Sequence, residues 1–246
     1  MVLREELRVT NMKMHKIADL NVLLDYKYEI LNHQAPPYEI SEACDPDITI
    51  ALSDEYLQLQ QKNNPHLSIN DCEYIFTGSI FYDKLIDMGG LLLHSSAVEY
   101  KGKAYLFSAP SGTGKSTHTG MWLKAFGDEA RIINDDKPAI RVIDGVAYAY
   151  GTPWSGKTDL NINTKVPIGG ICFIERAQEN SIKKIPTSIA IAKILNQTLR
   201  PSDAARMSNL LDSLDKVLRC TEVYLLGCNI SEEAALVAYN GMKGND

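Results

Sequence analysis

The first 80 residues show only a weak pattern of apolar and polar positions. β-Branched and aromatic residues predict two short strands, at 47–52 and at 74–76, and stretches rich in Pro, Asn and Asp predict loops between them. Apolar residues then recur at helical spacing over 78–88, which predicts a helix that leads into the rest of the chain. We therefore expect a small β-rich N-terminal subdomain over residues 1–80 and a larger domain over residues 81–246.

The larger domain begins with strong strand signals. Residues 91–109 predict two apolar strands joined by a tight turn at 101–103. A loop and a helix follow them and lead to a third strand that begins at 131–133. Residues 139–150 predict a hairpin around an Asp-Gly turn, and the near-continuous apolar run 169–174 is typical of a strand that is buried on both faces.

The remainder of the chain is predicted to be mainly helical. Residues 188–199 form one amphipathic segment, and apolar residues at i, i+3, i+4 and i+7 make a clear stripe over 207–218. A late strand is predicted at 224–226, and Ser231 is expected to cap a final helix. Strands that alternate with helices make the expected fold class α/β.

The segment between the second strand and the helix carries the clearest chemical signal. Residues 109–116 read Ala-Pro-Ser-Gly-Thr-Gly-Lys-Ser, which matches the phosphate-binding pattern G-x-x-x-x-G-K-[ST] except for Ala109 in the first place. Small residues let successive backbone N–H groups point at one phosphate cluster, and the helix adds the positive end of its dipole. A Gly-rich turn that merely caps a helix is the simpler alternative, but the position after a strand and before a helix favours a nucleotide site. The residues expected to bind the nucleotide are Ser111, Gly112, Thr113, Gly114, Lys115, Ser116 and Thr117.

Within this site we expect Lys115 to reach the β- and γ-phosphates and the Ser116 hydroxyl to bind Mg²⁺. Asp135 and Asp136 end the third strand, and paired carboxylates beside a phosphate loop can hold Mg²⁺ or accept a proton from an attacking hydroxyl. The alternative is a turn in which one Asp caps the next element. The 20-residue spacing between Lys115 and Asp135, with one helix between them, indicates a parallel neighbouring strand and favours the functional interpretation. His94 lies on a strand expected to pair beside the loop strand, although a lone His in an apolar strand is more often a core residue.

Together these residues resemble the catalytic domain of HPr kinase/phosphorylase, which has a strand with a histidine, a hairpin, S-G-T-G-K-S and a strand ending in two aspartates. More distantly they resemble the nucleotide-binding core of ATP-dependent phosphoenolpyruvate carboxykinase. Residues 151–163 and 166–185 are similar to small uncharacterised HPr-kinase-related proteins of Gram-positive bacteria. The similarity is strongest over about residues 90–180. It implies a P-loop fold with a mixed sheet and flanking helices, and phosphoryl transfer from ATP to a hydroxyl.

By position, the resemblance implies that Asp135 is the general base and Asp136 the carboxylate on the Mg²⁺ side, although the two could be exchanged. His94 matches the family histidine that lies near these carboxylates. The family signature E-I-R-G-L-G is replaced by Thr-Pro-Trp-Ser-Gly-Lys at 152–157, which argues against HPr as the substrate and against reversal with inorganic phosphate. Lys157 is the candidate for the missing positive charge at the transferring phosphoryl group, with an ordinary surface lysine as the alternative. Trp154 is expected to anchor this loop by packing, or to form a wall of the acceptor pocket.

Composition excludes several classes of function. With 45% hydrophobic and 23% charged residues, the chain has the composition of an ordinary globular protein. A net charge of −6 without a run of Lys and Arg argues against sequence-independent binding to nucleic acid. The five cysteines are odd in number and form no C-x-x-C pair, which argues against a zinc site and a disulfide framework. The first 20 residues have no apolar signal core and no apolar run is long enough for a membrane span, so we expect a cytoplasmic location and no membrane partner.

The leading hypothesis from the sequence is a kinase that uses ATP and Mg²⁺ and phosphorylates a serine-like hydroxyl of a peptide, a protein or a small metabolite. A non-catalytic nucleotide-binding sensor or assembly factor is the alternative, because Ala109 departs from the phosphate-loop pattern. A carboxykinase-like lyase is a third hypothesis, and it would need additional metal ligands. The resemblance also makes a homo-oligomer plausible. Three further residues carry expectations of their own. His118 either contacts the nucleotide or faces solvent, and Glu175 and Arg176 form a charged pair at a strand end.

Overall fold

The computed structural model describes residues 12–42 and 44–244. The chain divides into two compact units, one up to Phe81 and one from Tyr82 onward, and each is described by itself. The N-terminal unit has a three-stranded sheet in the order β1-β2-β3, in which β1 and β2 are antiparallel and β2 and β3 are parallel. Its strands are β1 (Lys13–Ile17), β2 (Leu20–Leu24) and β3 (Ile48–Ile50). The pattern at 47–52 predicted β3, whereas β1 and β2 were not predicted.

The N-terminal unit also contains helices. Its helices are α1 (Glu29–Gln34), the 3₁₀ turn η1 (Pro36–Tyr38), α2 (Asp54–Asn63) and α3 (Ile69–Asp87), the last of which continues past Phe81. The strand expected at 74–76 is wrong, because these residues lie inside α3. A capping box overrides their β propensity: the Asp71 N–H donates to Ser68 Oγ at 3.1 Å, and the Ser68 N–H donates to Asp71 Oδ2 at 2.9 Å.

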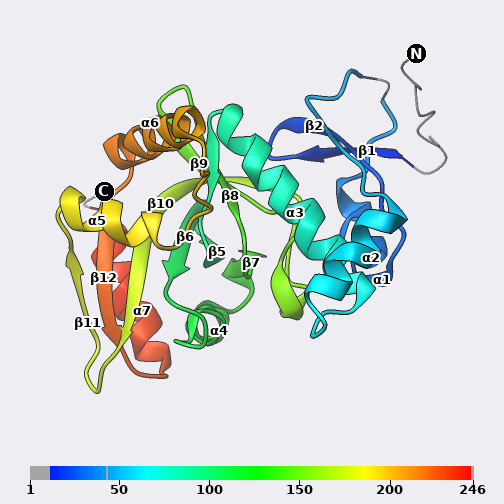
Figure 1. Ribbon diagram of the computed structural model, residues 1–246. Coiled ribbons are helices and arrows are strands. Elements are labelled where there is room, and N and C mark those ends of the chain that lie inside the picture. Colours follow the sequence, from blue (N-terminus) through cyan, green and yellow to red (C-terminus); the bar gives the residue numbers. More distant parts are fainter. Residues whose placement is uncertain (1–11, 43, 245–246) are drawn as a thin grey trace, which may run out of the picture. The chain divides into compact units, whose positions relative to one another are not determined.

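The second unit is built on one mixed sheet (Figure 1). Seven strands follow in the order β4-β8-β9-β10-β6-β5-β7, and β12 and β11 extend the sheet beside the second half of β10. The strands are β4 (Gly90–Leu92), β5 (Ser95–Tyr100), β6 (Lys103–Ser108), β7 (Ala130–Asn134), β8 (Ala139–Ile143), β9 (Val146–Tyr150), β10 (Lys165–Arg176), β11 (Ser181–Lys184) and β12 (Val223–Cys228).

The long strand β10 makes the sheet curl, because its two halves have different partners on one side. Lys165 to Pro167 pair antiparallel with β9, and Ile171 to Arg176 pair parallel with β12. On its other side β10 runs parallel to β6. The carboxyl ends of β6, β10 and β12 therefore meet at one edge of the sheet, which is where ligands bind in open α/β sheets.

Helices cover both faces of this sheet. They are α4 (Lys115–Phe126), α5 (Thr187–Leu195), α6 (Ala204–Cys220) and α7 (Glu232–Met242). Alternate residues of β10 enter two different cores: Ile171 and Phe173 pack with α5 and α6, and Cys172 and Ile174 pack with α4 and α7. This two-sided burial explains why the strand reads as an unbroken apolar run.

The architecture is mixed α/β with a curled mixed sheet and flanking helices, as the sequence predicted at this level. The hairpin at 139–150 and the helices at 188–199 and 207–218 are confirmed with small shifts of their ends. One expectation about β7 is wrong: β5 lies between β6 and β7, so β7 runs in the direction of β6 without being its neighbour. No helix within the described residues is both long and apolar enough to cross a lipid bilayer.

Candidate functional site

The loop between β6 and α4 has a backbone that depends on glycine. Gly112 has φ +76° and Gly114 has φ +121°, a region that side chains with a Cβ rarely adopt. Gly114 is also the residue that precedes the first turn of α4, where unpaired N–H groups carry the positive end of the helix dipole. The loop thus presents backbone donors at a helix start, an arrangement that suits an anion.

The loop is held from outside by Arg176, at the end of β10. Its Nη2 donates to the Gly112 carbonyl at 2.6 Å, and its Nε donates to the Thr113 carbonyl at 3.2 Å. These two charge-assisted hydrogen bonds fix the direction of two loop carbonyls. The sequence predicted only that Arg176 pairs with Glu175 at the strand end. The structure corrects this, because Arg176 binds the loop carbonyls. Glu175 turns instead to Lys193, at 3.4 Å.

Lys115 and the neighbouring hydroxyls line one cavity of about 450 Å³. The Lys115 side chain is buried, and its Nζ donates to the Ala109 carbonyl at 3.1 Å, inside its own loop. Burial lowers the pKa of Lys115, and the carboxylates of Asp136 and Asp135 oppose that effect. The cavity also contains every predicted site residue except Thr113. Its lining consists of His94, Ser111, Gly112, Gly114, Lys115, Ser116, Thr117, Asp135, Asp136, Ser155, Gly156, Lys157 and Thr158.

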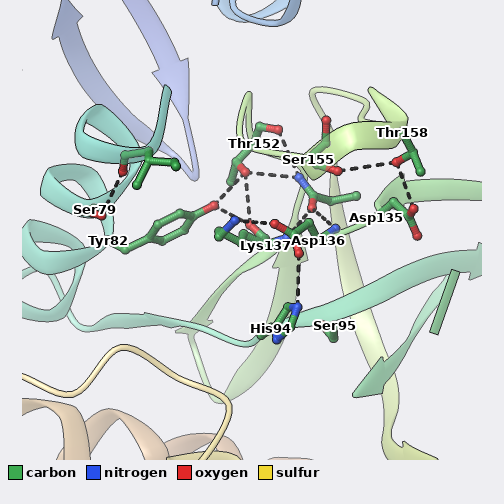
Figure 2. A network of polar contacts seen from close by, with 12 residues as sticks. Ser79, Tyr82, His94, Ser95, Asp135, Asp136, Lys137, Thr152, Ser155 and Thr158 are labelled. Atoms are coloured by element: carbon green, nitrogen blue, oxygen red, sulfur yellow. Dashed lines mark hydrogen bonds and ion pairs between the residues drawn. The ribbon is translucent and has the colours of Figure 1, made fainter. Parts of the chain in front are cut away.

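The two carboxylates after β7 have different partners (Figure 2). Asp135 is buried and accepts hydrogen bonds from the Ser96 hydroxyl at 2.5 Å and from the Thr158 hydroxyl at 2.8 Å. Ser96 comes from β5 and is itself in contact with the Thr119 hydroxyl of α4, at 2.7 Å. Asp135 is therefore held in one orientation from two sides by neutral donors.

Asp136 instead meets two nitrogen groups. His94 Nε2 lies 3.2 Å from its Oδ1, and the Lys137 ammonium contacts its other oxygen. Burial by itself would raise the pKa of Asp136, but the hydrogen bond from His94 and the charge of Lys137 outweigh it and lower the pKa to about 2. Asp136 is thus ionised at neutral pH, which suits a cation or a positively charged substrate group.

His94 occupies a break in the predicted strand rather than a strand interior. The run 91–100 is divided into β4 and β5, and His94 lies between them. Its backbone N–H donates to the Gln197 carbonyl at 2.8 Å, and its Nδ1 lies 3.1 Å from the Gln197 side-chain oxygen. Gln197 therefore orients the ring that reaches Asp136.

The segment 152–158 closes the cavity beside the carboxylates. Gly156 has φ +78°, and a Cβ built on it would lie 2.9 Å from the Asp136 Cβ. Trp154 is buried and packs edge-on against the ring of Tyr82, with 5.7 Å between the ring centroids. This packing agrees with the predicted anchoring role. Lys157 is exposed and lines the cavity.

The donor set of the cavity fits Mg²⁺. Ser116 and Asp136 offer a hydroxyl and an ionised carboxylate, and hard oxygen donors are the ligands that Mg²⁺ prefers. Among the residues that the structure describes, no group of three or more His, Cys, Asp and Glu side chains gathers as a metal site. A cation held here would take its remaining ligands from phosphate oxygens and water, as is usual for nucleotide-bound Mg²⁺.

The comparison with protein families decides the family. The family model described as "SynChlorMet cassette protein ScmC" matches residues 60–231, which is more than half of the chain. The chain belongs to the ScmC family. The ScmC match contains the loop, both carboxylates and the segment 152–158. No curated protein sequence matches the chain.

Among solved structures, the Hpr(Ser) kinase/phosphatase from Coxiella burnetii is similar, with a TM-score of 0.36 and 8% sequence identity. The match covers 60% of this chain and 91% of that one. The family shown for the chain is ScmC.

Sequence reasoning missed four residues of this ScmC site. Arg176 and Gln197 act on residues 63 and 103 positions away, respectively, so local sequence gives no signal for them. Ser96 and Thr158 are hydroxyl residues close to the predicted His94 and Lys157, and that proximity was the one available hint. The two alternatives for His118 are also decided in part, because its ring is buried and does not face solvent.

Proposed function

We propose that the chain is a phosphotransferase that moves the γ-phosphoryl group of ATP, with Mg²⁺, to a hydroxyl of a peptide, a protein or a small metabolite. The observation that carries the proposal is that the glycine loop with Lys115 and the two differently held carboxylates line the same cavity of about 450 Å³. Phosphoryl transfer needs this combination, because its catalysis consists mainly of positioning and of charge stabilisation.

The phosphate end of the proposed substrate would lie on the loop amides and the start of α4. Lys115 donates to the Ala109 carbonyl, and a bound phosphate oxygen would replace that acceptor. Arg176 supports this by holding the loop carbonyls of Gly112 and Thr113. The loop is then arranged for phosphate before the nucleotide arrives.

Ser116 and Asp136 would hold Mg²⁺, and the ion would supply charge neutralisation on the phosphate oxygens. The lowered pKa of Asp136 supports this assignment, because the group is ionised at neutral pH without the ion. His94, which is itself oriented by Gln197, contacts the carboxylate and keeps it in place.

Asp135 is then the residue left for the acceptor. The acceptor hydroxyl would give its proton to an Asp135 oxygen while its own oxygen forms a bond to the γ-phosphorus. The bond between that phosphorus and the β–γ bridging oxygen breaks, and ADP keeps the bridging oxygen. Lys157 lines the cavity and is the candidate for additional positive charge on the transferring group.

One observation favours the second candidate, a nucleotide-binding sensor. Both oxygens of Asp135 already accept hydrogen bonds, from Ser96 and from Thr158, so the base must exchange one of them for the acceptor. A protein that never makes that exchange would bind ATP and not turn it over. A cytoplasmic location, a homo-oligomer and the absence of a nucleic-acid partner stay predictions from the sequence.

The experiment is transfer of ³²P from γ-labelled ATP with Mg²⁺ to a mixed pool of peptides and hydroxyl metabolites. Lys115→Ala is compared with Lys124→Ala, which removes an exposed lysine from the same helix. The proposal expects label in the acceptor pool with the wild type and Lys124→Ala, and none with Lys115→Ala. Tight ATP binding without hydrolysis or transfer would favour the sensor instead.

A further inference from the structure

A second cavity, of about 440 Å³, adjoins the first at the glycine loop. The two cavities share Gly112, Gly114 and Thr117. The walls of the second cavity come from the first two turns of α4 and from the ends of β10 and β12. Its volume lies in the range of small-molecule sites.

The chemistry of this second cavity differs from that of the first. Met121, Ile174, Ala177 and Ile230 give it apolar walls, and none of its lining residues carries a carboxylate. Ile230 is 78% exposed, which makes it the most exposed large apolar side chain of the described residues. Together with the other apolar walls it lines one cavity, and small-molecule sites are lined mainly by such side chains.

His118 adds a polar observation. The indole N–H of Trp122 donates to His118 Nε2 at 3.1 Å, so the ring proton lies on Nδ1 when the ring is neutral. Burial lowers the pKa of His118 to about 4, which keeps the ring neutral. His118 lines the cavity, and its Nδ1 is buried without a hydrogen-bond partner in the part of the chain that is described. The wall of the cavity at His118 is therefore uncharged at neutral pH.

We infer that the second cavity binds the nucleoside of the triphosphate, an inference that rests on the proposed function. A nucleoside triphosphate is an elongated ligand, and its γ-phosphate has to lie beside Asp135 for transfer. The nucleoside must then leave the loop at the end away from the carboxylates. The second cavity adjoins the loop, has the size for a base and a ribose, and carries no charge that would repel the phosphates.

The same walls indicate how the base is held. The side-chain amide of Asn229 is already engaged, because its Nδ2 donates to the Gln178 carbonyl at 3.0 Å and its Oδ1 accepts from Ser231 at 2.6 Å. Arg176 is engaged with the loop carbonyls. The base is therefore held mainly by packing against apolar side chains, and its edge is read by few side-chain groups. A pocket without dedicated polar contacts distinguishes adenine from guanine only modestly. ATP and GTP therefore bind with affinities within about tenfold of each other.

The test is the dissociation constants of Mg²⁺-ATP, Mg²⁺-GTP and inorganic tripolyphosphate, measured by calorimetry. Ala177→Trp fills the cavity from an exposed position, and Ile230→Ala removes the rim side chain. Leu236→Ala is the matched control, since Leu236 is an exposed apolar residue of α7 outside both cavities. We expect Ala177→Trp to weaken both nucleotides at least tenfold, and Ile230→Ala to weaken them about threefold to tenfold. Tripolyphosphate binding stays unchanged in all three variants.

The outcomes separate this inference from the proposed function. A wild type that binds no triphosphate at all overturns both. If the wild type binds ATP no more tightly than tripolyphosphate, or Ala177→Trp binds ATP like the wild type, only the nucleoside assignment is overturned. A preference of more than a hundredfold between ATP and GTP overturns the apolar account of base binding.

Discussion

Gly156 lies so close to Asp136 that a Cβ on the glycine would come within 2.9 Å of the aspartate Cβ. Its φ of +78° is also one that alanine adopts only with strain. Gly102 has a similar φ of +71° but open space around it, so Gly102→Ala isolates the cost of the backbone strain. We expect Gly156→Ala to lower the free energy of unfolding by about 2 kcal/mol more than Gly102→Ala does, as measured by urea denaturation. Equal losses in the two variants would show that the contact with Asp136 does not constrain the loop.

The hydrogen bond from Thr158 to Asp135 is the second relationship that a substitution can test. Thr158→Val keeps the shape of the side chain and removes the donor at 2.8 Å, whereas Thr158→Ser keeps the hydroxyl. Because the Thr158 hydroxyl donates to the proposed base, transfer should slow about tenfold in Thr158→Val while the ATP affinity holds. Thr158→Ser should restore the rate. A loss of ATP affinity in place of a loss of rate would contradict this assignment.

The two hydrogen bonds from Arg176 to the loop predict the opposite result, a loss of ATP affinity. Arg176→Ala frees the carbonyls of Gly112 and Thr113, and the loop then has to be ordered by the nucleotide itself. ATP affinity should fall about tenfold by calorimetry, with little change in the thermal midpoint. Arg219→Ala, which removes an exposed arginine from α6, should leave the affinity unchanged. An Arg176→Ala variant that binds ATP like the wild type would show that Arg176 does not order the loop for ATP.

Buried His118 predicts how stability depends on pH. Its pKa is lowered from 6.5 to about 4 by burial, so between these values the unfolded chain binds a proton that the folded chain does not. Stability therefore falls as the pH drops from about 6.5 to about 4, by about 3 kcal/mol for this group. Urea denaturation across that range gives the free energy of unfolding at each pH. This free energy should change less steeply with pH for His118→Asn than for the wild type or for the exposed-site control His66→Asn. The same slope in all three proteins would contradict the prediction.

Local signals were sufficient for much of the fold. The Asp-Gly turn between two strand segments predicted the hairpin at 139–150, and Ser231 begins α7 as an N-cap that accepts from the Ala234 N–H. Where prediction failed, a competing signal was stronger, as with the capping box of Ser68 and Asp71 that makes 74–76 helical. The strand break at His94 comes from long-range pairing, since β4 joins β8 while β5 joins β6 and β7.

The candidate site was predictable to the extent that its residues lie in short motifs. The loop 109–116 and the pair Asp135 and Asp136 could be found in this way, and the structure brings them into one cavity. The residues that orient them could not, because Arg176 and Gln197 reach their partners only after the sheet and its helices are assembled. The second cavity could not be predicted from short motifs either, because its walls come from three separate elements, β10, β12 and α4.

The proposed mechanism assigns two separate roles: the loop binds the phosphates, and Asp135 acts on the acceptor. Its most direct test measures Mg²⁺-ATP affinity and phosphoryl-transfer rate together in Lys115→Ala and Asp135→Asn, with Asp128→Asn as an exposed control. The account predicts that Lys115→Ala loses both, and that Asp135→Asn keeps its ATP affinity within about twofold and loses about 10²-fold or more in rate. An Asp135→Asn variant that transfers phosphate at the rate of the wild type would contradict it.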